Sequence, residues 1–206
     1  MPLVETSEWL ELGSSTVAEA SGVRCALDPA IRPAWSGARA CGPAYPVQCR
    51  PGTNLPVHAA LELAPPGSVL VVDAGGDVAG YWGEVLARAA VQRGLVGVVV
   101  DGGVRDVDAM AHLGFPAFAR GIGIDGTGKA PEGSVGEPLQ LRVPVVAGDL
   151  VVADADGVVV VPARIVDATL VHARERRDKE RAVFARIEAG ESTVDIYGWR
   201  QVVDQW

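Results

Sequence analysis

Residues 73–106 read DAGGDVAGYWGEVLARAAVQRGLVGVVVDGGVRD, and this stretch decides how the chain folds. The apolar run Val69–Asp73 leads into it and predicts a strand that is buried on both faces. A Gly-rich turn follows, then a helix of about Glu84–Arg93 and a second strand, Gly97–Val100. If the two strands are parallel, the loops that follow them meet at the same edge of the sheet.

That edge gathers charged side chains. Glu84 opens the helix, and Asp101 and the pair Arg105-Asp106 follow the second strand. Converging carboxylates suit Mg²⁺ or Mn²⁺, and the free first-turn amides from Glu84 to Leu86 suit a small carboxylate or phosphate. Two simpler interpretations stay open: Glu84 interacts only with the helix dipole, and Arg105-Asp106 is a surface ion pair or a helix cap.

Composition limits the class of protein. The 206 residues suit one domain, or a domain with a helical extension, and the net charge of −8 argues against a non-specific nucleic-acid binder. Three cysteines without C-x-x-C spacing indicate neither disulfides nor a zinc site, and we expect no signal peptide because the first residues include acids and no apolar region. The longest apolar runs have strand length, so we expect a cytoplasmic protein that does not enter a membrane.

Other known motifs are missing. The glycines before Glu84 match neither the dinucleotide fingerprint nor the P-loop, and no G-x-S-x-G or Cys–His signature suggests a hydrolase. The three histidines, His58, His112 and His172, form no ligand pattern, and we interpret them as surface or core residues.

The rest of the chain has alternating helix and strand signals. Further helices are expected at Glu5–Leu12, 16–22, Leu55–Ala64, 106–113 and Ala163–Ala189. Further strands are expected at Tyr45–Arg50, Ala117–Arg120 and Leu139–Ala147, followed by a hairpin over 150–161. Residues 28–40 and 121–138 are expected to be loops, and the first of them is expected to enter a strand near Gly37–Cys41.

The C-terminal helix is unusually charged. Its middle, HARERRDKERA, predicts a solvated helix with ion pairs one turn apart or, alternatively, an arm that packs on a neighbouring subunit. The tail after it exposes Tyr197, Trp199 and Trp206 unless something covers them, which favours oligomerisation.

The central stretch resembles the signature of the RraA-like family, which includes the class II 4-hydroxy-4-methyl-2-oxoglutarate aldolases. Its specific core is an acid, twenty residues, then Arg-Asp, and the resemblance extends over most of residues 14–175. The resemblance implies an α/β fold, a swivelling β/β/α domain like the phosphohistidine domain, with a C-terminal helical extension. It also implies a homotrimer or a hexamer of two trimers, with active sites between subunits. We treat 1–206 as one domain, with residues 176–206 contacting a neighbouring subunit.

The resemblance also implies roles for the central residues. Asp106 would bind the divalent metal directly and Glu84 would hold a metal-bound water. Arg105 would contact the ketone oxygen of pyruvate, and the turn at Gly83 with the amides of Val85 and Leu86 would hold the substrate carboxylate.

The expected reaction is cleavage of 4-hydroxy-4-methyl-2-oxoglutarate, or a related 4-hydroxy-2-oxo acid, to pyruvate through an enolate. Oxaloacetate decarboxylation needs the same enolate and is expected as well. Two alternatives remain: another lyase acting on a different 2-oxo acid, and a non-catalytic regulator that binds a ribonuclease of the E type. Relatives named for that inhibition lack the intact Arg-Asp pair, which this chain keeps.

Overall fold

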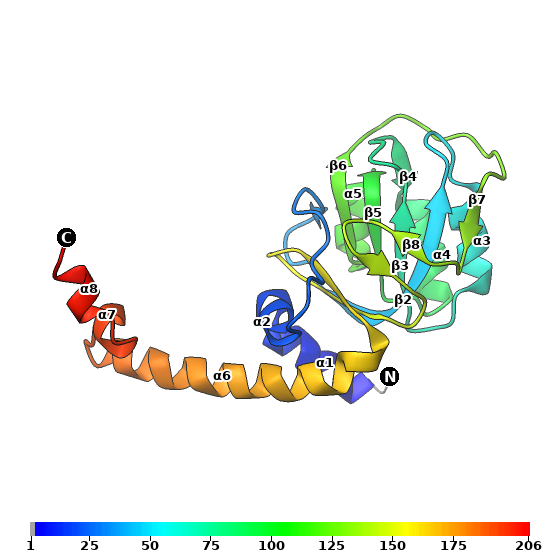
Figure 1. The fold of residues 1–206 in the computed structure, drawn as a ribbon. Helices are drawn as coiled ribbons and strands as arrows, with labels where there is room; N and C mark the ends of the chain where they lie inside the picture. Colours follow the sequence, from blue (N-terminus) through cyan, green and yellow to red (C-terminus); the bar gives the residue numbers. More distant parts are fainter. Residues whose placement is uncertain (1–2) are drawn as a thin grey trace.

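The expected strand–helix–strand unit lies at the centre of the computed structural model, which describes residues 3–206 (Figure 1). β3 (Val69–Asp73), α4 (Glu84–Gln92) and β5 (Gly97–Val104) follow one another along the chain. β3 and β5 pair in parallel, and β3 places alternate side chains in two hydrophobic clusters. The expected parallel pairing and the burial of both faces are therefore confirmed.

The main sheet has nine strands within the described residues. Their order is β1-β6-β5-β3-β2-β10-β11, while β4 pairs with β5 and β7 pairs with β2. The contacts β2–β3, β3–β5, β4–β5 and β5–β6 are parallel and the others are antiparallel. The other strands are β1 (Arg32–Pro33), β2 (Ala40–Cys49), β4 (Gly80–Trp82), β6 (Ala117–Ile122), β7 (Gly133–Val135), β8 (Leu139–Gln140), β9 (Pro144–Val145), β10 (Leu150–Ala153) and β11 (Val158–Val161).

Helices cover the sheet in two places. α3 (Leu55–Leu63), α4 and α5 (Val107–Leu113) pack on one face, where Trp82 stacks on Phe115. The separate β8–β9 hairpin helps to cover the opposite face. The helices α1 (Leu3–Leu12), α2 (Ser14–Ala20) and the start of α6 (Val166–Glu188) pack on β10 and β11.

The C-terminal helix leaves this body. A short 3₁₀ turn, η1 (Ala163–Ile165), leads into α6, which extends away from the sheet and carries α7 (Thr193–Ile196) and α8 (Arg200–Val203) at its far end (Figure 1). The long C-terminal helix expected from the sequence is confirmed. In the described part of the chain, no helix is both long and apolar enough to cross a bilayer.

Two glycine-rich stretches form strands where a turn and a strand end were expected. β5 continues through Gly102 and Gly103 to Val104, and β4 occupies part of the expected turn. A Cβ on Gly103 would lie 2.1 Å from the carbonyl oxygen of Val78, so glycine allows the preceding segment to cross the strand closely. The glycines therefore serve close backbone packing, which composition alone does not distinguish from a turn.

Two other expectations were wrong in their bounds. The strand entry expected near Gly37–Cys41 and the strand expected from Tyr45 are one strand, β2, which begins at Ala40 and contains Pro43 and Pro46. Pro43 ends the pairing with β10, and Pro46 lies just before the pairing with β7 begins, so neither proline interrupts a ladder. The single strand expected at Leu139–Ala147 is instead two short antiparallel strands, β8 and β9, of two residues each.

Candidate active site

The two halves of the central motif meet through Gly83 and Asp106. Oδ2 of Asp106 accepts a hydrogen bond from the backbone N–H of Glu84 at 3.1 Å. A Cβ on Gly83 would lie 2.4 Å from the same oxygen, so only glycine leaves room for this approach. The N–H of Arg105 donates to the carbonyl of Trp82 at 2.8 Å, which fixes the register of the two loops.

Asp106 has a left-handed backbone with φ of 56°, the sole positive φ outside glycine in the described residues. Aspartate tolerates this conformation better than most residues, yet it remains sparsely populated. The conformation occurs where β5 turns into α5, and the carboxylate lies against the N-terminus of α4. Strained backbone of this kind concentrates at functional sites.

Arg105 lies beside this carboxylate. Its Nε is 3.7 Å from Oδ2 of Asp106, and about half of each side chain is exposed. A Cβ on Gly80 would lie 2.8 Å from Cδ of Arg105, so the arginine passes closely over β4. The guanidinium is therefore held beside the Asp106 carboxylate rather than extended into solvent.

A cavity of about 270 Å³ opens at this point. One wall comes from the central motif and includes five of the residues that the sequence analysis singled out: Gly83, Val85, Leu86, Arg105 and Asp106. The rest comes from other segments: Asn54, His58, Gly80, Tyr81, Gly126, Thr127 and Lys129.

Glu84 is placed differently from the other predicted residues. Its backbone N–H reaches Asp106, but its carboxylate is bonded by Arg88 one turn along α4, at 2.8 Å from Nε and 2.7 Å from Nη2. Its side chain is not part of the cavity wall. This is an exposed pair of the kind that contributes little stability, so releasing the carboxylate costs little.

Asp101 does not join the site. Its carboxylate is bonded by Nε of Arg120, whose Nη2 also lies 3.1 Å from Asp28. Bonding to these acids raises the pKa of Arg120. The expectation that Asp101 adds a carboxylate beside Asp106 was wrong, because β5 continues past it and Arg120 neutralises it.

Asn54 supports the far wall and has an unusual feature. It is 4% exposed, and its Nδ2 donates to the carbonyl of Tyr81 at 2.9 Å, but among the residues that the structure describes its buried Oδ1 has no hydrogen-bond partner. A buried acceptor without a donor is costly. Because Asn54 lines the cavity, a ligand hydroxyl or amide there would relieve this cost.

Tyr81 and Asp77 hold this wall together. The phenol of Tyr81 donates to Asp77 at 2.7 Å, and the N–H of Gly52 bonds both side chains. The hydrogen bond from Tyr81 lowers the pKa of Asp77, while burial raises the pKa of Tyr81 to about 12. The phenol therefore remains protonated and links β4 to the turn before α3.

The remaining polar groups are His58 and Lys129. Burial, with a smaller effect from the positive charge of Lys129, lowers the pKa of His58, so the imidazole is neutral at pH 7. Lys129 lies on the loop after β6, which is tied to the α3 side by the N–H of Asn54 donating to Gly128 at 3.1 Å. The sequence predicts His58 to be a surface or core residue without a functional role, but in the structure it lines the cavity. Neither residue has a motif spacing that points to this position.

The side chains at the cavity suit a metal ion that takes few ligands from the protein. In the described part of the chain no three His, Cys, Asp or Glu side chains gather as a complete metal site. Asp106 is available, because its Oδ1 accepts no hydrogen bond within that same part and its side chain is 42% exposed. One carboxylate is enough for Mg²⁺, which keeps several waters and takes oxygens from its substrate.

Comparisons with known proteins agree with the expected family. The sequence model described as "RraA-like: Aldolase/RraA" matches residues 14–160. A curated relative from Halalkalibacterium halodurans, named "Putative 4-hydroxy-4-methyl-2-oxoglutarate aldolase", is 37% identical over 169 residues, which cover 79% of this chain and 80% of the relative.

Solved structures extend the similarity to the whole fold. Streptomyces coelicolor RraAS2, described as an unusual member of the RNase ES inhibitor RraA family, is 29% identical with a TM-score of 0.77, covering 91% of this chain and 98% of that one. An uncharacterized protein from Pseudomonas syringae is 27% identical with a TM-score of 0.80, covering 93% and 96%. The fold expected from the resemblance, an α/β RraA-like domain with a C-terminal helix, is confirmed.

Proposed function

Because this chain belongs to the RraA-like family, we propose that it is a divalent-metal-dependent lyase that releases pyruvate from a 4-hydroxy-2-oxo acid such as 4-hydroxy-4-methyl-2-oxoglutarate. One observation carries the proposal. A guanidinium, an available carboxylate and the start of a helix line one wall of one cavity. These are the groups that an enolate reaction needs: an anchor for a carboxylate and stabilisers for a negative oxygen.

The 2-oxo acid end of the substrate binds at the start of α4. The N–H groups of Val85 and Leu86 lie in the first turn of the helix, so no carbonyl of the helix accepts a hydrogen bond from them. They donate hydrogen bonds to the substrate carboxylate. Arg105 donates to the ketone oxygen. Asp106 would hold Mg²⁺ or Mn²⁺ directly and Glu84 would hold it through a water, and the ion would supply a Lewis acid that polarises the ketone.

Cleavage then follows from charge placement. A base takes the proton of the C4 hydroxyl, the C3–C4 bond breaks, and its electron pair becomes the enolate of pyruvate while C4 becomes a carbonyl. Arg105 stabilises the enolate oxygen. A water held by Glu84, once this carboxylate leaves Arg88, returns a proton to C3. Oxaloacetate gives the same enolate by losing CO₂, so we propose decarboxylation as a second activity of the site.

The far wall suits the other end of the substrate. Lys129 is a cation that lines the same cavity as the start of α4, and the buried Oδ1 of Asn54 lacks a donor that a substrate hydroxyl would provide. Neutral His58 adds one donor or acceptor. We propose that Lys129 binds a distal carboxylate, which selects dicarboxylic 4-hydroxy-2-oxo acids.

We further propose that the enzyme is a cytoplasmic homotrimer or a hexamer of two trimers. Four aliphatic side chains around the cavity and its neighbouring loops are strongly exposed: Val78 (53%), Val85 (77%), Ile122 (62%) and Ile124 (88%). Apolar surface of this kind supports coverage by another subunit. The cytoplasmic location is supported by three cysteines that are buried as free thiols.

Arg105 provides the direct test. Arg105→Ala should lower the rate of pyruvate release at least about 10²-fold, the usual cost of removing one oxyanion partner, and EDTA should abolish the wild-type rate until Mg²⁺ is restored. The measurement is coupled pyruvate detection over a panel of 4-hydroxy-2-oxo acids and oxaloacetate. Near-wild-type turnover by Arg105→Ala with Mg²⁺ present would show that the assignment is wrong.

Lys129→Met tests the substrate class within the same panel. We expect the KM for dicarboxylic substrates to rise about tenfold or more with little change in kcat, because a lost distal contact weakens ground state and transition state alike. Substrates without a second carboxylate serve as the control and should be unaffected. Equal losses for both classes would remove the proposed role of Lys129.

A ribonuclease-binding role is the second candidate, supported by similarity to the Streptomyces protein. It predicts capture of a ribonuclease of the E type by the full chain and no pyruvate release. The intact Arg105-Asp106 pair favours the lyase.

A further inference from the structure

The proposed cleavage needs a base, and one side chain at the cavity suits that role. The ionisable residues that line the cavity are His58, Tyr81, Arg105, Asp106 and Lys129. Arg105 and Lys129 are cations with no site for a further proton, and Asp106 is proposed to hold the metal. Tyr81 keeps its proton because burial raises its pKa to about 12. Within the part of the chain that the structure describes, His58 is therefore the cavity side chain that is free to take a proton.

His58 is in its proton-accepting form at neutral pH. Burial lowers the pKa of its imidazole below the ordinary value of about 6.5, and the positive charge of Lys129 lowers it further. The other charged groups at the cavity are Arg105, which is a second cation, and Asp106, whose negative charge a bound divalent cation would offset. The imidazole is therefore neutral at pH 7 and gains a proton only as the pH falls through its lowered pKa.

The place of His58 in the fold matches the place where the substrate must lose a proton. In the proposed binding mode the start of α4 holds the carboxylate at C1, and Arg105 holds the ketone oxygen on C2. The hydroxyl is on C4, two carbons further along the substrate, so its base must come from another part of the cavity surface. His58 comes from α3 and lines the same cavity of about 270 Å³, whose size suits a small acid.

A second observation, independent of the charge on His58, indicates a hydroxyl near this residue. Among the described residues, the buried Oδ1 of Asn54 has no donor, and Asn54 lines the cavity. Asn54 directly precedes α3, and its carbonyl accepts a hydrogen bond from the N–H of His58 at 3.4 Å. Because the two residues are one helical turn apart, a substrate hydroxyl that donates to Oδ1 is also within reach of the imidazole. An amide oxygen orients a hydroxyl but does not keep its proton, whereas an imidazole does.

We propose that His58 is the general base of the lyase reaction and takes the proton of the C4 hydroxyl, which Asn54 orients. As this proton moves to an imidazole nitrogen, the O–H electron pair forms the new carbonyl at C4. The C3–C4 bond breaks, and its electron pair forms the enolate of pyruvate. The imidazolium then gives its proton to water, which balances the proton that C3 takes up. The inference rests on the proposed function and adds the residue that starts the reaction.

The two proposed activities differ in their need for this base. Oxaloacetate loses CO₂ from the carbon next to C3 and has no hydroxyl proton to give up, so its decarboxylation does not require His58. Loss of the imidazole should therefore separate cleavage from decarboxylation. A histidine that only packed in the cavity wall, or only bound a carboxylate, would affect both activities alike.

The kinetic test compares His58→Gln with the wild type, as full chains with Mg²⁺. We expect kcat for the best 4-hydroxy-2-oxo acid to fall about 10²-fold or more, the usual contribution of a general base, with KM changed by no more than about threefold. The kcat for oxaloacetate decarboxylation should fall by no more than about threefold, because glutamine keeps a polar side chain of similar length. His172→Gln, the same change at an exposed histidine on α6, is the control and should leave both rates unchanged.

The imidazole itself gives a readout that does not depend on turnover. NMR titration of the Mg²⁺-loaded protein, with His58→Gln to assign the signal, measures the pKa of His58. Wild-type kcat/KM for cleavage should fall about tenfold per pH unit below this value, and decarboxylation should show no such decrease there. A substrate analogue with CH₂ in place of the ketone carbonyl cannot form the enolate. It should shift the imidazole resonances of His58 and leave those of His172 in place.

The results separate this inference from the proposed function. Equal losses of cleavage and decarboxylation in His58→Gln, or a pH dependence of cleavage that does not match the pKa from NMR, would overturn the role of His58. A wild type that decarboxylates oxaloacetate but cleaves no hydroxy acid would also overturn it. A wild type that releases pyruvate from neither class would remove the proposed function. The analogue then decides for His58: shifted resonances support its contact with the hydroxyl, and unchanged resonances overturn it.

Discussion

At the residue scale, the site depends on how closely Asp106 approaches the start of α4. The left-handed backbone of Asp106 places its carboxylate 3.1 Å from the Glu84 amide, and Gly83 leaves the necessary space. The acid, the spacing of twenty residues and the Arg-Asp pair are therefore one geometric unit. A glycine that looks like a simple helix cap sets the position of a carboxylate on another loop.

Gly83→Ala tests this unit. Its Cβ would meet Oδ2 of Asp106 at 2.4 Å, so the carboxylate must move, and we expect pyruvate release to fall about 10²-fold, as 1 Å misplacements typically do. Gly121→Ala is the control, because its Cβ would make an ordinary contact at 3.6 Å. The measurement is the rate for both variants, after circular dichroism shows that each is folded. Equal rates for Gly83→Ala and Gly121→Ala would show that the close approach has no catalytic importance.

The sequence predicted one wall of the cavity and missed the other. Gly83, Arg105 and Asp106 could be predicted because a parallel strand–helix–strand unit brings its two loops to the same edge, independently of the rest of the fold. Asn54 and Lys129 lie about 75 residues apart and meet only because a bridge between Thr53 and Gly128 joins their segments. No spacing rule links such residues, so only the tertiary fold shows that they face one ligand.

At the element scale, proline and glycine account for most of the misplaced boundaries. β3 was placed to the residue because its apolar run has no such interruption. The sequence predicts a strand entry near Gly37–Cys41 and a separate strand from Tyr45, but β2 continues from Ala40 through Pro43 without a break. Pro43 and Pro46 lie where the edge of β2 that faces away from β3 changes its partner from β10 to β7. The sequence rule that excludes proline from a strand assumes that the strand keeps the same partners along its whole length, whereas β2 pairs with β10, β3 and β7 over different residues.

The turn between β10 and β11 anchors α2 through a partly buried contact between Asp154 and Ser14. Asp154 accepts from the amide and the hydroxyl of Ser14, at 2.7 and 2.6 Å. Burial alone would raise the pKa of Asp154, but these bonds and one from the Asp156 amide outweigh it and lower the pKa. The contact therefore stabilises the fold at neutral pH, and this contribution disappears as pH falls through the lowered pKa.

Ser14→Ala should lower the free energy of unfolding by about 1–3 kcal/mol at pH 7, because the partly buried carboxylate of Asp154 loses a hydrogen-bond donor. Near pH 3, below the ordinary pKa of aspartate of about 4, the cost should be smaller, since the unfolded chain then protonates this group. Urea unfolding at the two pH values measures both. Ser15→Ala, at the exposed neighbouring position, should stay within about 0.5 kcal/mol. A cost for Ser14→Ala that is independent of pH would contradict the role of Asp154.

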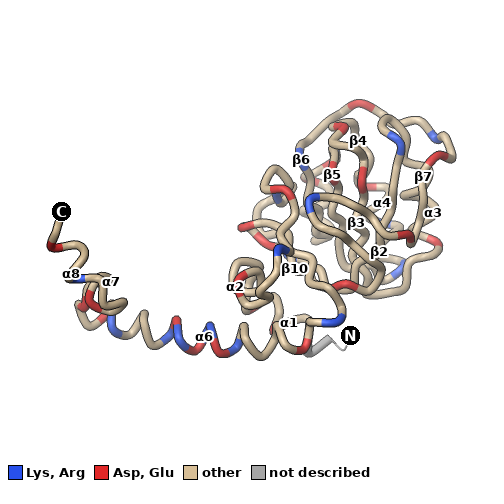
Figure 2. The backbone as a smooth tube through the Cα atoms, viewed as in Figure 1, with Lys and Arg blue, Asp and Glu red and all other residues tan. Residues whose placement is uncertain are grey.

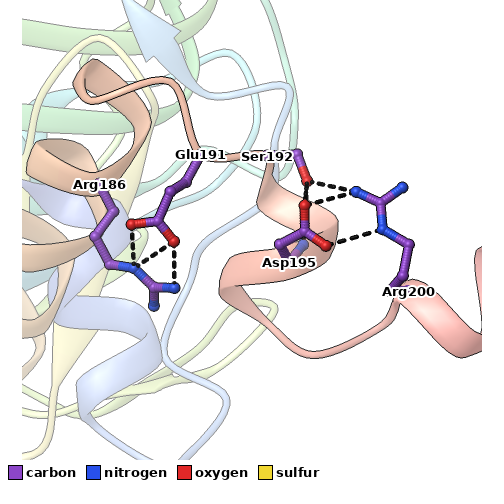
Figure 3. A network of polar contacts seen from close by, with 5 residues as sticks. All are labelled: Arg186, Glu191, Ser192, Asp195 and Arg200. Carbon is purple, nitrogen blue, oxygen red and sulfur yellow. Dashed lines mark hydrogen bonds and ion pairs between the residues drawn. The ribbon is translucent and has the colours of Figure 1, made fainter.

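At the scale of the whole molecule, the arm has two halves with different physical roles. The first half of α6 belongs to the body, because Ala173 is fully buried in a cluster with Trp9 and Val17. The far end contributes no buried residue in α7 or α8. Charged side chains of both signs lie along α6 (Figure 2), and ion pairs between exposed side chains hold the far end in shape (Figure 3). Trp199 and Trp206 are therefore exposed in the single chain, and its fold does not depend on burying them.

This division predicts a contrast between two changes to the arm. Removing residues 190–206 should alter the free energy of unfolding of the body by less than about 1 kcal/mol, since unburied side chains contribute little to folding. Ala173→Glu should cost more than about 3 kcal/mol, because it places a charge in an apolar cluster without a partner. Guanidinium unfolding of both proteins at one dilute concentration compares them, with wild type as the reference. If the truncation destabilised the body as much as Ala173→Glu does, the arm end would belong to the fold of the single chain.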